Sequence, residues 1–340
     1  MLNYMYINNT NLIDNVKQIK KQNPNSQICA MVKANAYGVG VKNVVKTLSP
    51  YVHYFGVANA REAEIVSKNT NKKILIVGCL EKTRSINNRF SYACHSLEDV
   101  KFLSSLNAKL NVHLKINTGM NRFGISNKNE FNLALKEISN SKLVLEGVFT
   151  HFATDDDYVD QQMLTFKSFV NIAKKQGFNP IVHVDNSIVS QKRNHHKAMV
   201  RIGFDLYNRN NYYFKPVVSI KSEIVQINTC KKGDLVGYNY KYVCPTCKTI
   251  AVVPIGYADG FSSAYIGLEL NFKGKKCKVL NVCMDCFMLD ITNVKTKKGD
   301  LIFILDENNP LKMYANYSKL SEYEVMCNFS HIRAKTIKIN

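Results

Sequence analysis

The sequence predicts an α/β protein, with an N-terminal (β/α)8 barrel followed by a C-terminal mostly-β domain. Eight short apolar segments alternate with helical patterns over about the first 200 residues, as in a barrel of this kind. Strand-like segments separated by turn residues dominate after that. The alternative is a doubly wound open sheet, but no Gly-x-Gly-x-x-Gly sequence opens the first helix. We therefore expect the barrel over residues 1–215 and the mostly-β domain over residues 216–340.

Each element is predicted from its periodicity. Apolar side chains at helical spacing predict helices over residues 9–22, 41–48, 61–67, 97–106, 130–139 and 159–176. Short runs of apolar residues predict barrel strands at residues 27–32, 54–58, 74–77, 90–94, 110–116, 143–149, 181–184 and 198–202. In the second domain the predicted strands are residues 217–227, 234–238, 248–254, 275–283, 287–291 and 300–305, with one helical piece near residues 318–328.

The composition is that of an ordinary globular protein with an excess of positive charge. Of 340 residues, 46% are hydrophobic, and the formal net charge is +20. Such a charge favours anionic partners, cofactors or substrates. The lysines and arginines are spread along the chain without an aromatic-interleaved basic stripe, so nucleic-acid binding is not expected. No apolar stretch approaches the ~20 residues of a membrane helix, and residues 1–6 do not resemble a secretory signal. We expect a cytoplasmic protein.

Ten cysteines are scattered along the chain, which is typical of reduced thiols in a cytosol. Two Cys-x-x-Cys pairs, Cys244 with Cys247 and Cys283 with Cys286, have the form of a zinc ribbon. The gap between the pairs is longer than the usual ribbon spacing. The alternative is that they are small apolar side chains in strands, and we expect no metal.

Lys33 follows directly on the first predicted barrel strand. Burial lowers the pKa of an ammonium group, and the neutral amine is the form that attacks a carbonyl. Lys33 is therefore a candidate Schiff-base lysine. The alternative is an ordinary strand-end lysine that extends its amine to solvent.

Polar residues also follow four other predicted strands. In a (β/α)8 barrel the carboxyl ends of all strands meet at the face that carries function. Arg122 alone has an ordinary explanation as a loop salt bridge, and His151 as a satisfied core histidine. Together the clusters predict a site at this face. They comprise Lys115 and Arg122 after the fifth strand, His151 after the sixth, Asn186 and Ser187 after the seventh, and Arg201 and Gly203 at the eighth.

The chemistry of these residues suits a phosphate. Hydroxyls of Tyr37 and Ser187 and the amide of Gly203 are able to donate to phosphate oxygens. A Schiff-base lysine together with a phosphate cradle indicates pyridoxal phosphate. An acidic partner at the cofactor's ring nitrogen makes it a strong electron sink, whereas an arginine leaves it unprotonated and weaker.

The sequence VKANAYG at residues 32–38 resembles the cofactor-lysine motif of alanine racemases. The resemblance continues in order along nearly the whole chain. The other matching segments are residues 115–124, 151–153, 186–187, 201–207, 254–260, 282–285 and 321–324.

The resemblance implies a racemase that interconverts L-alanine and D-alanine and supplies D-alanine for peptidoglycan. In this family two bases act on an aldimine of pyridoxal phosphate from opposite faces of the substrate's α-carbon. It implies that Lys33 holds the cofactor and is one base. Tyr257 from a partner subunit is the other, so the protein is a homodimer with shared active sites.

The resemblance also implies roles for the remaining site residues. Arg201 faces the pyridine nitrogen, and His151 connects the tyrosine base to Arg201. Arg122 contacts the cofactor's phenolic oxygen and the substrate carboxylate, and Lys115 matches a position that is often carbamylated. The further cofactor ligands are Tyr37, Asn186, Ser187, Gly203, Phe204 and Tyr323, and those at the substrate are Met284 and Asp285 of the partner subunit.

Three positions depart from the family pattern: Asn117 stands where an Asp is usual, Asn281 where an Arg is frequent, and the tail at residues 330–335 lacks the usual Arg-Val-Pro-Arg.

A broader amino-acid racemase, acting for example on serine, stays open. A related decarboxylase is disfavoured by Arg201. A binding protein without catalysis is disfavoured by the presence of both Lys33 and Tyr257.

Overall fold

The computed structural model describes residues 2–82, 86–153, 156–184, 198–208, 211, 213–239 and 242–339. Contacts divide the chain into two compact units. The first unit consists of Met1–Leu12, Tyr37–Val39 and Tyr207–Asn340, and the second of Ile13–Ala36 and Gly40–Leu206. Neither unit is a single continuous segment of sequence.

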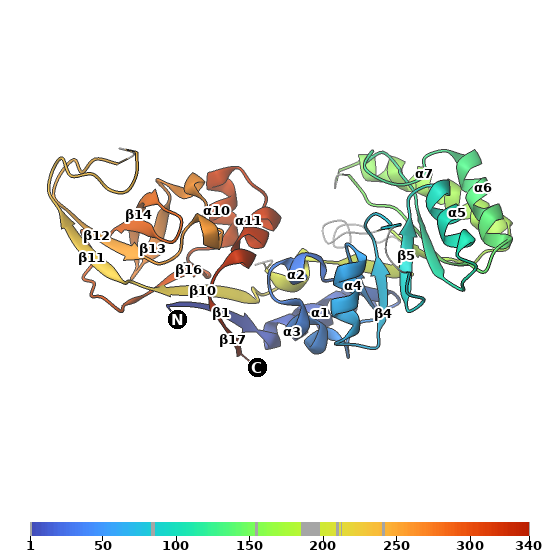
Figure 1. The fold of residues 1–340 in the computed structure, drawn as a ribbon, viewed down its shortest axis with the longest axis horizontal. Helices are drawn as coiled ribbons and strands as arrows, with labels where there is room; N and C mark the ends of the chain where they lie inside the picture. Colours follow the sequence, from blue (N-terminus) through green and yellow to red (C-terminus); the bar gives the residue numbers. More distant parts are fainter. Residues whose placement is uncertain are drawn as a thin grey trace. The chain divides into compact units, whose positions relative to one another are not determined.

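The second unit is the predicted (β/α)8 barrel (Figure 1). Its parallel strands neighbour one another in the order β8-β7-β6-β5-β4-β3-β2-β9. The Ala198 amide donates to the Val182 carbonyl at 3.1 Å and brings β9 and β8 together. All eight predicted strands are confirmed: β2 (Gln27–Met31), β3 (Tyr54–Val57), β4 (Lys73–Ile76), β5 (Phe90–Cys94), β6 (Asn111–Lys115), β7 (Val144–Phe149), β8 (Ile181–His183) and β9 (Met199–Ile202).

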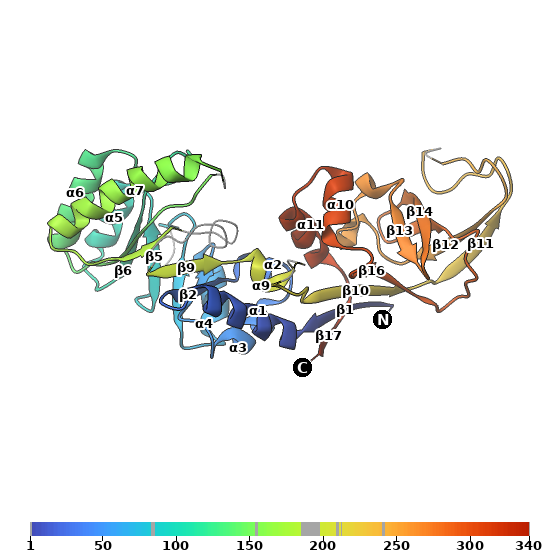
Figure 2. The ribbon, with the colours of Figure 1, turned by 180° about the vertical axis from the view of Figure 1, so that it is seen from behind.

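Figures 1 and 2 show α1, α3 and α4 on one side of the barrel strands and α5, α6 and α7 on the other. In α3, Val41, Val44, Val45 and Leu48 are buried, the single apolar face that the spacing predicts. No helix in the described part of the chain combines the length and hydrophobicity needed to cross a membrane. The helices are α1 (Asn9–Gln22), α2 (Lys33–Tyr37), α3 (Val41–Leu48), α4 (Ala60–Ser67), α5 (Leu97–Ser105), α6 (Lys128–Ser139), α7 (Tyr158–Lys175) and α9 (Phe204–Tyr207).

The first unit is mostly β and contains two sheets. One has the order β16-β10-β1-β17 and the other β11-β12-β15-β14-β13. Two helices, α10 (Leu311–Ser318) and α11 (Glu322–Asn328), lie near the C-terminus. The strands are β1 (Asn3–Asn8), β10 (Val218–Glu223), β11 (Gln226–Cys230), β12 (Lys248–Val253), β13 (Glu269–Phe272), β14 (Lys275–Val282), β15 (Phe287–Asp290), β16 (Leu301–Leu305) and β17 (Lys335–Ile339).

The predicted strand at residues 234–238 is wrong. This segment makes only an isolated bridge between Leu235 and Val243. Gly233 and Gly237 have φ angles of +91° and +70°, so the backbone turns where a strand needs extended residues. The segment 217–227, predicted as one strand, contains β10 and the start of the separate strand β11, and strands β1, β13 and β17 and helices α2, α9 and α10 were not predicted.

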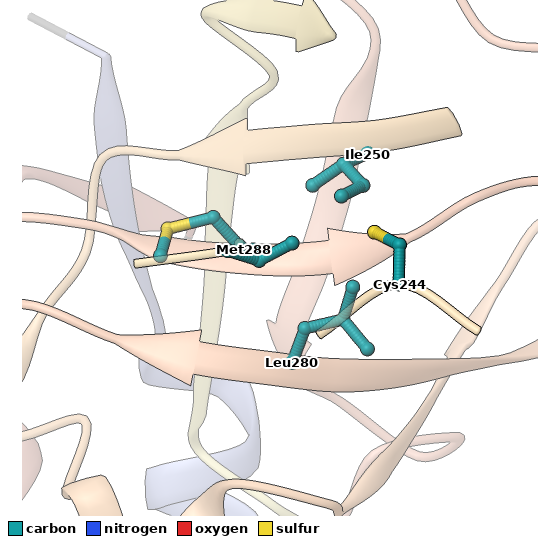
Figure 3. Packing of buried hydrophobic residues seen from close by; sticks show 5 residues of the cluster. Cys244, Ile250, Leu280 and Met288 are labelled. Carbon is teal, nitrogen blue, oxygen red and sulfur yellow. The ribbon is translucent and has the colours of Figure 1, made fainter. Parts of the chain in front are cut away.

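The Cys244 side chain lies in the hydrophobic core of the second sheet. Figure 3 shows it gathered with Ile250, Leu280 and Met288 of β12, β14 and β15. Its thiol is hydrogen-bonded to Cys230, and burial raises its pKa, while Cys247 is exposed. Among the described residues no group of three or more His, Cys, Asp or Glu side chains is placed to hold a metal ion. Cys244 thus packs as a small apolar side chain.

Gly147 of β7 provides a test of the barrel packing. A Cβ at this position would lie 2.1 Å from Nδ1 of His113, whose ring is held by hydrogen bonds at both nitrogens. A Cβ at Gly56 of β3 would instead meet the flexible end of Met31. We expect Gly147→Ala to lower the free energy of unfolding by about 3 kcal/mol, and Gly56→Ala by about 1 kcal/mol. Urea denaturation measures both, and equal losses would contradict this account of the packing.

Candidate active site

Lys33 begins a short left-handed turn, α2, directly after the buried strand β2. Ala34, Asn35, Ala36 and Tyr37 all have φ between +51° and +56°. Left-handed backbone costs an L-residue about 1–2 kcal/mol, and asparagine tolerates it better than alanine does. Such a turn persists only where its surroundings hold it.

Hydrogen bonds from outside and within the turn hold it in place. The Glu62 carboxylate, on α4, accepts from the Ala34 amide at 2.7 Å and from the Ala58 amide at 2.7 Å. The Asn35 side chain accepts from the Val41 amide at 2.9 Å. Glu62 was not singled out from the sequence, yet its carboxylate joins the turn after Lys33 to the end of β3.

The loop after β6 is closed on itself and carries Arg122. The Asn117 side-chain oxygen accepts from the amides of Gly119 at 3.2 Å and Asn121 at 3.0 Å. The Ile125 amide donates to the Lys115 carbonyl at 2.9 Å and closes the loop. The neutral amide of Asn117 therefore organises the loop at the position where the family usually has an aspartate.

Five of the predicted residues interact electrostatically with one another at the carboxyl ends of the barrel strands. Burial lowers the pKa of His151 to about 3, assisted by the positive charges of Arg201, Arg122, Lys115 and Lys33. Burial, followed by Arg122, Arg201 and Lys33, lowers the pKa of Lys115 to about 8. His151 is therefore neutral at pH 7, and the surrounding cations favour an anionic ligand.

Arg201 is buried and its guanidinium is held by acceptors on neighbouring strands. One nitrogen, Nη1, lies 2.5 Å from Nδ1 of His183 and donates to the His183 carbonyl at 3.1 Å. The other, Nη2, donates to the Thr150 carbonyl at 2.7 Å. Burial lowers the pKa of Arg201 to about 10, so it stays charged at neutral pH. His183 was not assigned a role from the sequence.

The residues expected to hold the phosphate, taken with the further cofactor ligand Asn186, fall into three groups. Gly203 and Phe204 are buried at the start of α9 in the barrel unit. In the first unit the Tyr37 ring lies 6.2 Å from the Tyr323 ring, and burial followed by Tyr323 raises the Tyr37 pKa. Asn186 and Ser187 lie outside the described residues.

Tyr257 and Met284 lie on two segments of the first unit that are hydrogen-bonded to each other. The Tyr257 amide donates to the Cys283 carbonyl at 3.0 Å, and the Ala258 amide to the Met284 carbonyl at 3.1 Å. Gly256 permits this approach, since a Cβ there would lie 2.3 Å from both carbonyl oxygens. Tyr257 is 51% exposed and Met284 53% exposed. The two side chains therefore project from a fixed pair of turns.

Arg333 joins these two turns by ion pairs. Its Nε and Nη2 donate to the two oxygens of buried Asp259 at 2.7 and 2.9 Å, and Nη2 also donates to Asp285 at 2.7 Å. Burial opposes ionisation of Asp259, but hydrogen bonds from Arg333 and the Gly256 amide outweigh it and lower its pKa. The chain thus places an arginine on the Tyr257 turn although its tail departs from the family pattern.

Comparison with known proteins gives the family. A family model described as alanine racemase, N-terminal domain, matches residues 7–210, and one described as alanine racemase, C-terminal domain, matches residues 217–337. This chain belongs to the alanine racemase family.

Individual alanine racemases match over nearly the whole length. That of Borreliella burgdorferi is 32% identical over 95% of this chain and 93% of its own length. That of Staphylococcus saprophyticus is 31% identical over 96% of this chain and 92% of its own. A solved alanine racemase from Clostridium difficile superposes with a TM-score of 0.92 at 30% identity, covering 100% of this chain and 96% of that one. One from Bacillus anthracis, with bound L-Ala-P, has a TM-score of 0.92 at 29% identity, covering 99% and 95%.

Asn281, at a position where other alanine racemases often have an arginine, is directed into the first unit. Its amide nitrogen donates to the carbonyls of Val236 at 2.9 Å and Tyr238 at 3.3 Å. A Cβ on Gly237 would lie 2.5 Å from this nitrogen, so glycine allows the approach. The asparagine therefore joins β14 to residues 236–238.

The Arg333 ion pairs predict a specific cost of losing the arginine. Arg333→Met leaves the buried Asp259 carboxylate without its main partner, so we expect it to lower the free energy of unfolding, by an amount that solvent reduces because the arginine side chain is 58% exposed. The control is Lys276→Met, which breaks an exposed pair with Glu269 at 3.4 Å and should change it by less than about 0.5 kcal/mol. Urea denaturation measures both. A loss for Arg333→Met no larger than that of the control would refute the role.

Proposed function

We propose that this member of the family interconverts L-alanine and D-alanine with pyridoxal phosphate as its cofactor, and supplies D-alanine for peptidoglycan. The observation that carries the proposal is the set of cations around His151 at the carboxyl ends of the barrel strands. A phosphate and a phenolic oxygen are anionic groups that such a set attracts. When bound, pyridoxal phosphate withdraws electrons from an amino acid's α-carbon and acidifies its α-hydrogen.

Two bases on opposite faces of the α-carbon account for inversion. We assign Lys33 to one face, where it also holds the cofactor, and Tyr257 of the partner subunit to the other. One base removes the α-proton while the other returns a proton from the opposite side. His151 is neutral at pH 7, so it is able to accept a hydrogen bond from the tyrosine base.

The exposure of Tyr257 and Met284 supports a homodimer with shared sites. Both side chains are more than half exposed on turns fixed by hydrogen bonds and by Arg333. A large aromatic and a methionine held in this way suit insertion into a second subunit. We assign Met284 and Asp285 of the partner subunit to the access path and to the substrate carboxylate.

Arg201 favours a racemase over a decarboxylase of similar fold. Its pKa of about 10 keeps it charged, and a cation at this position would disfavour protonation of the ring nitrogen of a bound cofactor. An unprotonated ring nitrogen would supply a weaker electron sink, which suits removal and return of a proton at one carbon. We assign Arg122 to the phenolic oxygen and the substrate carboxylate, and the phosphate and remaining cofactor contacts to Tyr37, Asn186, Ser187, Gly203, Phe204 and Tyr323.

The cysteines support a cytoplasmic location. All ten are free thiols, which is the usual state in a reducing compartment.

Assays over a panel of small amino acids, serine included, establish how narrow the preference for alanine is.

Mixing two defective variants tests the proposed function and the shared site together. Lys33→Ala removes one base and Tyr257→Phe the other, so each should lose most racemisation of L-alanine. In a mixed dimer one site lacks both groups and the other has both. Equal mixing with free exchange should therefore restore about a quarter of the wild-type rate. Native mass spectrometry confirms the mixed dimers. No recovery with mixed dimers present refutes shared sites, and an inactive wild type refutes the racemase assignment.

The lowered pKa of Lys115 predicts carbamate formation. Carbon dioxide reacts with the neutral amine, and a pKa of about 8 leaves about half of the Lys115 amine neutral at pH 8, against under about 1% for an ordinary lysine. We expect ¹³C-labelled bicarbonate to give one carbamate carbonyl signal, weakening as the pH falls below 8, because protonation removes the nucleophile. The signal should be absent in Lys115→Met and present in the exposed-lysine control Lys276→Met. A signal that persists in Lys115→Met places the carbamate elsewhere.

A further inference from the structure

A chain of hydrogen bonds runs through the barrel interior from Arg201 to Glu146. Nη1 of Arg201 lies 2.5 Å from Nδ1 of His183. Nε2 of His183 lies 2.8 Å from Nδ1 of His113, and Nε2 of His113 lies 3.0 Å from Oε2 of Glu146. Both imidazoles are fully buried. Four groups from β9, β8, β6 and β7 thus form one continuous chain of hydrogen-bond donors and acceptors.

The chemistry of the two ends determines the direction of every bond. A guanidinium only donates, so Nδ1 of His183 accepts and its proton sits on Nε2. That proton is donated to Nδ1 of His113, whose own proton therefore sits on Nε2 and is donated to Glu146. Each link is satisfied only if both imidazoles are neutral Nε2–H tautomers.

We propose that Glu146 is a positioning residue, which holds His113 and His183 in the Nε2–H tautomer and so keeps an acceptor aimed at Arg201. The proposal rests on the proposed function, in which Arg201 faces the cofactor's ring nitrogen. Glu146 lies at the far end of the hydrogen-bond chain from Arg201 and acts through the two histidines.

The surroundings of Glu146 hold it as a carboxylate. Oε1 accepts from Lys73 Nζ at 2.6 Å and from the Tyr54 hydroxyl at 3.0 Å. Oε2 accepts from the Ser91 hydroxyl at 2.5 Å in addition to the bond from His113. These donors lower the pKa of Glu146 despite burial. A carboxylate that accepts from four groups offers no proton to His113 Nε2.

Packing prevents the imidazoles from rotating to other partners. The Phe149 ring stacks on His183 at 4.7 Å between centroids, with 10° between the planes. Gly147 lies against the ring of His113, where any Cβ would be 2.1 Å from Nδ1. Because burial also lowers the pKa of both histidines, neither gains a second proton near neutrality.

The tautomers of the unmodified protein are the first test. Two-bond ¹H–¹⁵N correlation spectra of the wild-type protein with its cofactor, labelled with ¹⁵N-histidine, distinguish Nε2–H from Nδ1–H. His→Asn variants at 113 and 183 assign the signals. We expect both residues to be neutral Nε2–H tautomers at pH 7. An Nδ1–H or doubly protonated ring at either position overturns the proposal, and this outcome does not depend on racemase activity.

Glu146→Gln is the second test, because its amide has one acceptor and one donor end. Lys73 cannot accept a hydrogen bond, so the amide NH2 is driven to the Oε2 side, next to His113 Nε2. His113 Nε2 then becomes the acceptor, and its proton moves to Nδ1. The same reversal passes to His183.

With the direction of each hydrogen bond reversed, a His183 Nδ1–H lies opposite the Arg201 guanidinium, so that two donors face each other. We expect Glu146→Gln to show Nδ1–H tautomers and to lower kcat for alanine racemisation about tenfold or more, with KM changed less than twofold. The control Ser91→Ala removes one donor and keeps the carboxylate, so wild-type tautomers and kcat should be retained. Nε2–H tautomers with unchanged kcat in Glu146→Gln overturn the proposal. If wild-type tautomers are as expected but no variant racemises alanine, the proposed function has failed and the histidine arrangement has not.

Discussion

The buried positive charge of Arg201 is the constraint on which the barrel interior depends. An ion removed from water costs several kcal/mol unless it is paired and its donors are satisfied. Here the guanidinium donors are satisfied by the His183 ring, the His183 carbonyl and the Thr150 carbonyl, and His183 and His113 connect them by hydrogen bonds to the Glu146 carboxylate. Positions that would otherwise hold valine or leucine in a barrel core are therefore imidazoles, and Gly147 leaves room for one of them. One polar residue on each of β6, β7 and β8 is thus connected by hydrogen bonds to the arginine of β9.

A buried ion also organises the first unit, on a smaller scale. Asp259 is fully buried at the end of the turn that begins with Tyr257, and Arg333 supplies its partner from the segment before β17. The same arginine reaches Asp285 on the turn that carries Met284. An exposed tyrosine on a free loop would sample many positions. Fixing its backbone by an ion pair and two hydrogen bonds between the turns limits the entropy that the tyrosine would lose on entering the partner subunit proposed above.

Much of the fold was predictable, because eight apolar runs alternating with amphipathic helices leave few other architectures. The cations of the site were predictable as well, because Lys33 and Arg122 follow strands, and Arg201 lies near the end of one, whose carboxyl ends must meet. The buried chain of hydrogen bonds from Arg201 to Glu146 was not predictable. His113 is 70 residues from His183 and 33 from Glu146, so their contact depends on the order of strands. The one available signal was polarity within strands, since His113 stands between Val112 and Leu114 in an apolar run.

Other elements were missed because their partners are remote or their signal is local strain. β1 pairs with β10 and β17, both more than 200 residues away, and its short run of tyrosines and asparagines is weak evidence for a strand. The residue types after Lys33 do not predict a left-handed turn, because glycine would be the expected choice there. Alanine there is costly in the folded state, although it also restricts the unfolded chain.

That turn is where the sequence passes from one compact unit to the other, between Ala36 and Tyr37. Its strain persists because Glu62 and the Asn35 side chain satisfy the backbone around it. A right-handed helix over the same residues would direct Lys33 and Tyr37 differently, and a flexible glycine turn would not fix their separation. The left-handed turn gives the backbone of these five residues one defined course. Under the proposed function, in which Lys33 holds the cofactor and Tyr37 its phosphate, the strain is the cost of keeping both residues in one short, ordered segment.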